Sequence, residues 1–189
     1  KLFIYNYTNN SLVAAPQAAL SNFLGGPAFI YRMLVLPNGH LLLGSLGDGT
    51  LWDYAPDGSP AAAWAPTIVG SPVKNSDGSY TLTGTQLTGI SEGSSYGDDA
   101  ESSTNYPIVR LKAASGNVYY ARTSQWTPGV ATGPLQTRVR FTVPSTVPRG
   151  TYTLSVIANG IASTGKSFVF APSIPDQLVD SAKSIPTIG

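Results

Sequence analysis

The chain has 189 residues, of which 11% are charged, and a formal net charge of +1. Its length allows an apolar core that needs no covalent staples. The small net charge and the scattered lysines and arginines exclude the basic surface of a nucleic-acid-binding protein, and the absence of cysteine excludes disulfides, thiolate nucleophiles and cysteine-based metal centres.

The composition predicts an all-β protein. The sequence holds 20 glycines and 15 prolines, a combination typical of many short strands joined by tight turns. No apolar run approaches the roughly 20 residues of a membrane-spanning helix, so we predict no membrane span. No signal-peptide pattern precedes Lys1, so we expect a mature or excised piece of a protein. The low charge and the many small polar residues favour an extracellular or cell-surface location.

Residues 1–68 are predicted to form a small set of strands. The apolar and aromatic residues at 1–7 indicate a first strand. The turn Pro37-Asn38-Gly39 between two apolar runs predicts a hairpin. The further strands of this part are expected at 31–36, 40–44 and 49–54.

Residues 69–171 have the evenly spaced strands and turn signals that are typical of a β-sandwich. Between Arg138 and Val143, apolar and polar residues alternate, which is the pattern of a half-buried antiparallel strand. The strands are expected at 79–87, 108–112, 118–122, 138–143, 151–158 and 167–170. The segment 172–189, which contains several prolines, is predicted to be an extended tail.

Three segments of the chain carry a family pattern: Leu-Val-Leu-Pro-Asn-Gly-His-Leu-Leu at 34–42, Trp-Asp-Tyr-Ala-Pro-Asp-Gly at 52–58 and Trp-Ala-Pro-Thr-Ile at 64–68. Together they resemble the last kelch-type blade of the galactose oxidase and glyoxal oxidase families. In these families a propeller is followed by an immunoglobulin-like domain, to which residues 69–171 are similar. The resemblance therefore implies an immunoglobulin-like (E-set) β-sandwich preceded by an incomplete kelch-type β-propeller blade segment at 1–68.

The resemblance also implies where the sandwich would contribute to a copper site. Members of the family bind copper through two tyrosines and two histidines, with one tyrosine cross-linked to a cysteine, and one histidine lies in a segment resembling Thr-Asn-His. The matching segment here is Thr104-Asn105-Tyr106, the chain has no cysteine, and its single histidine, His40, follows a turn. We therefore predict no catalytic residue and no cofactor in this chain.

Three carboxylates, Asp98, Asp99 and Glu101, are gathered in one predicted loop. Carboxylate oxygens are ligands that calcium prefers, so these residues are candidates for a calcium site. Their spacing does not match an EF-hand loop, and the alternative is that they form Asx turns and cap strands. A glycosidase pair is not supported, because adjacent side chains of an extended chain point to opposite sides.

Exposed aromatic side chains can stack on sugar rings, and Trp52, Trp126 and Tyr120 are the candidates for this role. The alternative is that they pack in the core or between domains, since aromatic side chains bury a large apolar area. Asn6 and Asn9 begin the glycosylation sequons Asn-Tyr-Thr and Asn-Asn-Ser, which matter if the source glycosylates its secreted proteins.

Our first functional hypothesis is a non-catalytic extracellular structural or adhesion module. An incomplete propeller leaves strand edges whose N–H and C=O groups need partners. These sheets would be completed by a neighbouring subunit, in a homo-oligomer or filament, or by upstream propeller blades. Two alternatives stay open: the C-terminal part of a copper radical oxidase-like enzyme whose catalytic residues lie upstream, and a carbohydrate-binding β-sandwich.

Overall fold

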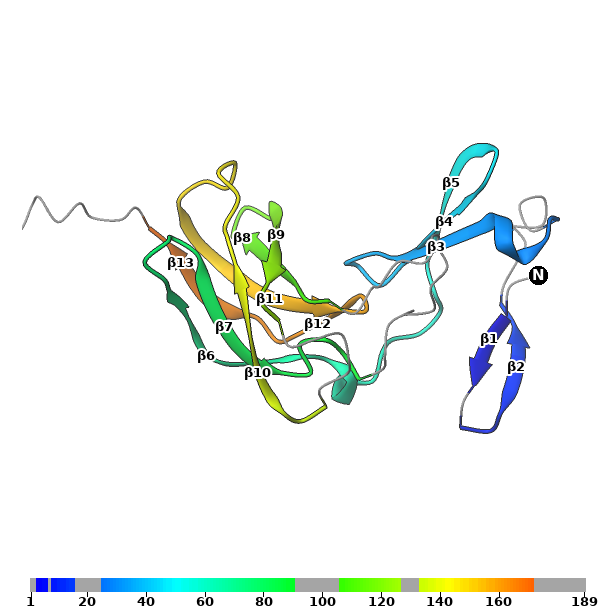
Figure 1. The fold of residues 1–189 in the computed structure, drawn as a ribbon, viewed down its shortest axis with the longest axis horizontal. Coiled ribbons are helices and arrows are strands. Elements are labelled where there is room, and N and C mark those ends of the chain that lie inside the picture. The colour runs from blue at the N-terminus through cyan, green and yellow to red at the C-terminus, as the bar shows by residue number, and fades with distance from the viewer. Residues whose placement is uncertain (1–2, 7, 16–24, 91–105, 127–132, 172–189) are drawn as a thin grey trace, which may run out of the picture.

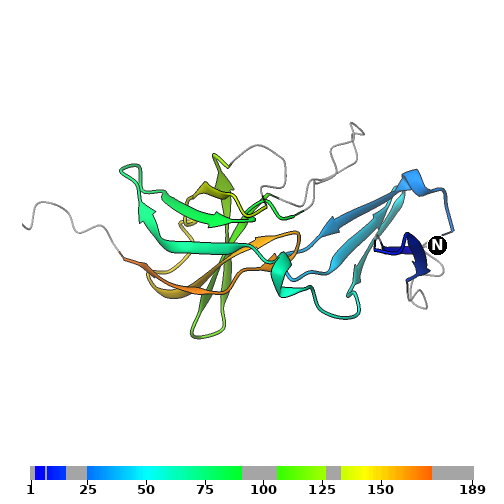
Figure 2. The same ribbon diagram turned by 90° about the horizontal axis from the view of Figure 1, so that it is seen from below.

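The computed structural model describes residues 3–6, 8–15, 25–90, 106–126 and 133–171, and it is all-β, as predicted. Its strands form three antiparallel sheets, and both ribbon views place the two small sheets together at one end of the molecule and the largest sheet toward the other (Figure 1, Figure 2). Helical structure in the described residues is limited to the short 3-10 turns Ala28–Ile30 and Ala62–Trp64. No helix in these ranges has the length and apolar character to cross a membrane.

The largest sheet curls into a β-sandwich. In spatial order it runs β12, β11, β8, β9, β10, β7 and β6, and β13 also pairs with β11. The strands are β6 (Thr67–Lys74), β7 (Tyr80–Thr85), β8 (Ile108–Ala113), β9 (Val118–Ser124), β10 (Gln136–Phe141), β11 (Gly150–Ala158), β12 (Ile161–Ala162) and β13 (Lys166–Phe170). Because β9 and β10 join over only two residue pairs, the sheet turns there and its halves face each other. On the opposite side, β11 and β13 contact β6.

The two halves of the sandwich enclose one apolar core. In β10, Val139 and Phe141 are buried while Arg138 is exposed, which confirms the alternation read from the sequence. Tyr80 stacks on Phe141 with ring centroids 5.3 Å apart, and Phe168 meets both rings edge-on. Full burial of an apolar side chain of this size stabilises a fold by about 1.5–3 kcal/mol, so these central strands hold the sandwich together.

The first strand of the sandwich, β6, begins earlier than the sequence indicated. The expected first strand at 79–87 corresponds to β7, and the expected boundary between residues 68 and 69 falls inside β6. Gly70 and Pro72 obscured this strand in the sequence, because glycine weakens a strand and proline cannot donate to its ladder. Both residues are accommodated because β6 lies at the end of the sheet and its pairing with β7 shifts register around them.

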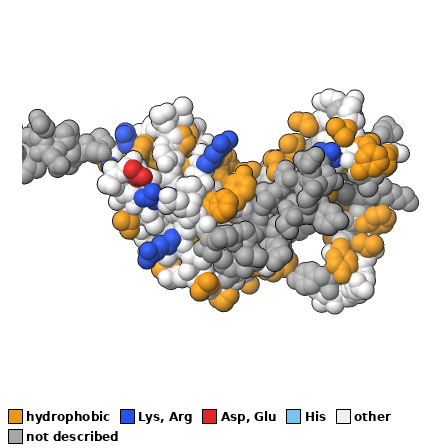
Figure 3. All heavy atoms as spheres, in the orientation of Figure 1, with side chains coloured by type: hydrophobic (Ala, Val, Ile, Leu, Met, Phe, Trp, Pro, Cys, Tyr) orange, Lys and Arg blue, Asp and Glu red, His pale blue; other side chains and the backbone are white. Residues whose placement is uncertain are grey.

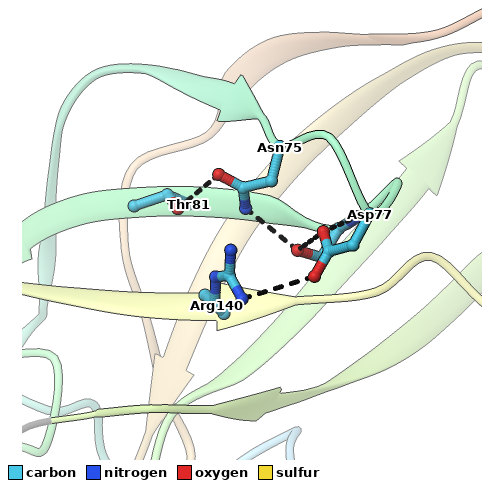
Figure 4. A network of polar contacts seen from close by, with 5 residues as sticks. Asn75, Asp77, Thr81 and Arg140 are labelled. Carbon is cyan, nitrogen blue, oxygen red and sulfur yellow. Dashed lines mark hydrogen bonds and ion pairs between the residues drawn. The ribbon is translucent and has the colours of Figure 1, made fainter.

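A polar network closes the turn between β6 and β7 (Figure 4). One carboxylate oxygen of Asp77 accepts from the Ser79 hydroxyl at 2.6 Å and from its backbone N–H at 3.1 Å, and the other pairs with Arg140 of β10 at 3.3 Å. Asn75 donates to the Ser79 hydroxyl and accepts from Thr81. The hydrogen bonds from Ser79, assisted by the charge of Arg140, hold the pKa of Asp77 below its usual value of 3.8.

A tyrosine fixes the corner that leads into β11. The Tyr152 hydroxyl donates a 2.6 Å hydrogen bond to the carbonyl of Pro148, four residues upstream. The Tyr152 ring meets Tyr119 edge-on. Burial, with a smaller contribution from Tyr119, raises the pKa of Tyr152 above its ordinary value of 10.0. The corner therefore favours the neutral phenol.

A three-stranded sheet precedes the sandwich and consists of β3 (Tyr31–Val35), β4 (Leu41–Ser45) and β5 (Asp48–Tyr54). The predicted hairpin around residues 37–39 and the predicted third strand are confirmed. Leu43, at the centre of β4, is only 2% exposed and packs against Tyr31, Leu41, Trp52 and Tyr54. The sheet thus has a small apolar centre of its own.

A separate hairpin, β1 (Phe3–Asn6) paired with β2 (Ser11–Ala14), lies beside that sheet, at the end of the molecule away from the sandwich (Figure 1). The sequence predicted the first of these strands. The second was not expected, because its four residues directly follow a polar turn and give too short a pattern to read. Within the described residues this hairpin is a sheet of two strands only.

Candidate functional site

The hairpin β1–β2 exposes apolar side chains on both of its faces. Phe3, Ile4 and Tyr5 of β1 are each more than half exposed, as are Leu12 and Val13 of β2. Because neighbours along a strand point to opposite faces, neither face is covered by the described residues. Figure 3 shows apolar side chains gathered at this end of the molecule, whereas lysines and arginines are more frequent over the sandwich.

Both small sheets also have open strand edges. Within the described ranges, β1 and β2 pair only with each other, and β3 and β5 each have a strand on one side only. Met33 and Leu34 of β3 and Leu51 of β5 are exposed apolar residues on these edge strands. Unpaired backbone groups beside apolar side chains are the features by which a sheet takes up a further strand. We refer to β1–β2 and the edges of β3 and β5 as the assembly surface.

The two glycosylation candidates lie at the turn end of the β1–β2 hairpin, Asn6 as the last residue of β1 and Asn9 in the turn itself. Asn6 Oδ1 accepts from the backbone N–H of Thr8 at 3.0 Å, and Asn9 Oδ1 accepts from the Ser11 hydroxyl at 2.7 Å. Both side chains are exposed, and the atom that glycosylation modifies is Nδ2 rather than Oδ1. A glycan at either position would therefore stand at the rim of the assembly surface.

The three aromatic residues proposed for carbohydrate stacking are not brought together. Trp52 is half-buried on β5 and packs against Leu43. Tyr120 on β9 is exposed, and Trp126, which is 38% exposed, follows the same strand six residues later. Six residues of extended chain span about 20 Å, so Tyr120 and Trp126 cannot hold the same sugar ring. Trp126 borders a hollow.

Trp126 stacks on Tyr106, with ring centroids 6.4 Å apart and an interplanar angle of 26°. The hollow beside Trp126 measures about 590 Å³ and is lined mainly by polar residues, namely Thr83, Gln125, Gln136, Thr137 and Arg138, together with Leu135. Tyr106 is the residue that the sequence comparison with Thr-Asn-His singled out. The sequence did not indicate that it pairs with Trp126, because no spacing pattern joins the two residues.

The single histidine of the chain is paired with a carboxylate. His40 Nδ1 lies 2.9 Å from Asp53 Oδ1, and both side chains are accessible to solvent. The backbone N–H of His40 donates to Asn38 Oδ1 at 3.1 Å. The sequence interpretation of His40 as a surface or turn residue matches this position. His40 also borders a cleft at the junction with the sandwich.

The three calcium candidates Asp98, Asp99 and Glu101 lie outside the described residues. Among the residues that the structure describes, no group of three or more histidine, aspartate or glutamate side chains is arranged to hold a metal ion.

The chain was compared with protein-family models, with curated protein sequences and with solved structures, and it shows no significant match to any of them.

Proposed function

We propose that this chain is a non-catalytic structural or adhesion module that acts outside the cell or at its surface. In this proposal the chain comprises an immunoglobulin-like (E-set) sandwich and an incomplete kelch-type propeller blade. A neighbouring subunit or upstream propeller blades complete its N-terminal sheets. The observation that carries the proposal is the assembly surface, with apolar side chains on both faces of a two-stranded hairpin and open edges on the sheet beside it.

The corner that leads into β11 supports the assignment of the sandwich as immunoglobulin-like. In immunoglobulin-like sandwiches a tyrosine near the start of a strand donates its hydroxyl to the backbone a few residues upstream. Tyr152, near the start of β11, has this hydrogen bond with Pro148. The sheet β3–β4–β5 supports the blade assignment, because propeller blades usually have four strands and this sheet has three.

The energetics favour a partner for β1–β2. An isolated two-stranded hairpin is at best marginally stable in water. More than half of the surface is still exposed in each of five apolar side chains of the hairpin: Phe3, Ile4, Tyr5, Leu12 and Val13. Since full burial of such a side chain is worth about 1.5–3 kcal/mol, completing the burial of all five would contribute about 4–8 kcal/mol. A covering sheet therefore stabilises the hairpin far more than its own pairing does.

The experiment is to compare the native polypeptide and the Leu12→Asp variant by multi-angle light scattering and thermal unfolding. Leu12 is 66% exposed, so a charge there is tolerated by the free chain but is costly in a covered hairpin. The matched control is Val118→Asp on β9, an exposed apolar residue of the sandwich. We expect Leu12→Asp to weaken assembly at least about tenfold, and Val118→Asp to leave it unchanged.

The mass of the native polypeptide distinguishes the two kinds of partner. If upstream blades belong to the same polypeptide, Leu12→Asp lowers the melting temperature of a monomer, and the enzyme alternative regains support. If the native chain is as short as this one, Leu12→Asp shifts the population from oligomer to monomer. A native chain that is monomeric and equally stable with either variant would refute the proposal.

A second candidate function, carbohydrate binding, is favoured by the stacked pair Tyr106 and Trp126 beside its hollow. A half-exposed aromatic pair with polar neighbours is suited to a sugar, which has an apolar ring face and hydroxyls at its edge. The test is a glycan array with the native chain and with Trp126→Ala. If Trp126→Ala binds the same glycans as strongly as the native chain, this hollow is not the carbohydrate site.

A further inference from the structure

We propose that the cleft between the three-stranded sheet and the sandwich is a second ligand site, which binds a neutral saccharide. The cleft measures about 560 Å³, within the range of about 300–1,000 Å³ for small-molecule sites. One wall is the turn between β3 and β4 with the segment at 56–60, and the other is the turn between β11 and β12, at 159–162. Trp64 borders the same space. This site shares no residue with the assembly surface or with the hollow beside Trp126.

Two glycines set the spacing of the cleft walls. A Cβ atom on Gly160 would lie 2.7 Å from the Cα of Gly39, 2.9 Å from Val35 Cγ1 and 3.0 Å from the carbonyl oxygen of Leu36. Gly160 and Gly39 both have a positive φ, at 74° and 88°, where other residues are strained. The backbones of the two units can approach this closely because Gly160 has no side chain, whereas a Cβ on Gly39 would meet only the Gly160 carbonyl oxygen, at 3.4 Å. The cleft is therefore bounded by backbone turns at a fixed contact.

The polar groups of the cleft suit hydroxyl recognition. An ionised carboxylate only accepts hydrogen bonds, so Asp53 requires the proton of His40 on Nδ1, where the two atoms are 2.9 Å apart. Because Nδ1 of His40 is engaged by Asp53, Nε2 is the ring nitrogen left for a ligand. Asp57 adds a second acceptor and Asn38 an amide to the lining. A sugar hydroxyl both donates and accepts, so it can satisfy each of these groups.

The apolar part of the lining suits a sugar ring. Trp64 is 38% exposed, so part of its indole surface is available to the ring face of a pyranose. Pro56 and Pro60 flank the segment that forms the wall, and proline holds its φ angle without a ligand. The aromatic surface and the prolines therefore add apolar surface to a cleft that also contains hydrogen-bonding groups.

Charge determines which saccharides fit. Among the described residues, the lining includes the carboxylate of Asp57 and the imidazole of His40, which is paired with Asp53, and no lysine or arginine. A sialylated, sulfated or phosphorylated ligand would bring a negative charge to the Asp57 carboxylate without a lysine or arginine to offset it. We therefore assign the cleft to neutral glycans.

The experiment uses the full chain on a printed array of neutral, sialylated and sulfated glycans, followed by a fluorescence titration with the neutral glycan that gives the strongest signal. We expect Trp64→Ala to weaken binding at least about tenfold, and Asp57→Ala to weaken it severalfold. Trp126→Ala distinguishes this cleft from the other hollow, because it removes an equally exposed tryptophan there. The control is Val169→Ala on β13, an exposed apolar residue that lines neither space. Near-ultraviolet circular dichroism establishes whether each variant is folded. If Trp64→Ala does not fold, Asp57→Ala provides the test of the cleft.

Three results would overturn the assignment: no neutral glycan bound at millimolar concentration, a preference for charged glycans, or full affinity in both Trp64→Ala and Asp57→Ala. Binding lost in Trp126→Ala alone would place the sugar at the other hollow. Light scattering of Trp64→Ala separates this inference from the proposed assembly function, because the variant should assemble as the native chain does.

Discussion

The contact between Gly39 and Gly160 makes a quantitative prediction for the substitution Gly160→Ala. Alanine at a left-handed φ costs about 1–2 kcal/mol. The added Cβ would also lie 2.7 Å from Gly39 Cα, and overpacking of this kind typically costs about 1–3 kcal/mol. The sum predicts a loss of about 2–5 kcal/mol in the free energy of unfolding, provided that the two units stay in contact.

Gly78→Ala is the matched control, because it isolates the backbone cost. Gly78 has a φ of 83°, and a Cβ built there meets nothing within 4 Å, so this variant should lose only the first part, about 1–2 kcal/mol. Urea unfolding followed by circular dichroism measures both values. Small-angle scattering reports whether Gly160→Ala relieves the overlap by letting the units separate, which would increase the radius of gyration. Equal losses in the two variants, with unchanged scattering, would refute the close contact as described.

Three further predictions concern the sandwich. Gly84→Ala should lower the free energy of unfolding of the sandwich by at least about 1–3 kcal/mol in urea, because the new Cβ would lie 2.1 Å from the carbonyl oxygen of Thr67 in the paired strand. A loss below about 0.5 kcal/mol would contradict the register of β6 on β7. The lowered pKa of Asp77 adds stability above pH 3.8 that is lost as the pH falls through the folded pKa. Asp77→Asn should therefore flatten the acid limb of a curve of unfolding free energy against pH. An unaltered acid limb would exclude the hydrogen bonds from Ser79 to Asp77 as the cause of the acid sensitivity. The raised pKa of Tyr152 gives stability that is present below pH 10 and lost as the pH rises above it. Tyr152→Phe should therefore flatten the alkaline limb of the same curve. An equally steep alkaline limb in the variant would show that ionisation of Tyr152 is not the cause of the alkaline loss.

The parts of the fold that could be predicted from the sequence are those with a local pattern. The alternation ending at Phe141 gave both the strand and its buried face, because period-two burial is visible within six residues. The turn at Asn38 and Gly39 gave a hairpin for the same reason. In β6, Gly70 and Pro72 interrupt the local pattern, and the strand is held by its pairing with β7, which the sequence does not display.

The candidate sites were less predictable, since they depend on residues far apart in the chain. The stacking of Tyr106 on Trp126 and the approach of Gly39 to Gly160 are tertiary contacts without a spacing signature. Trp64 stands in a blade-like segment, and nothing near it in sequence indicates a cleft. The expected incomplete propeller predicted unpaired strand edges, but their exposed side chains became identifiable only from the arrangement of the sheets.

The positions of β6 and β13 have a mechanical consequence. The chain enters the sandwich through β6, which pairs only with β7, and leaves through β13, which pairs only with β11. Tension applied along the polypeptide would therefore load these two rows of backbone hydrogen bonds before it reached the central strands. The apolar core between β7, β8, β10 and β11 would bear force only after one of the two outer strands had detached.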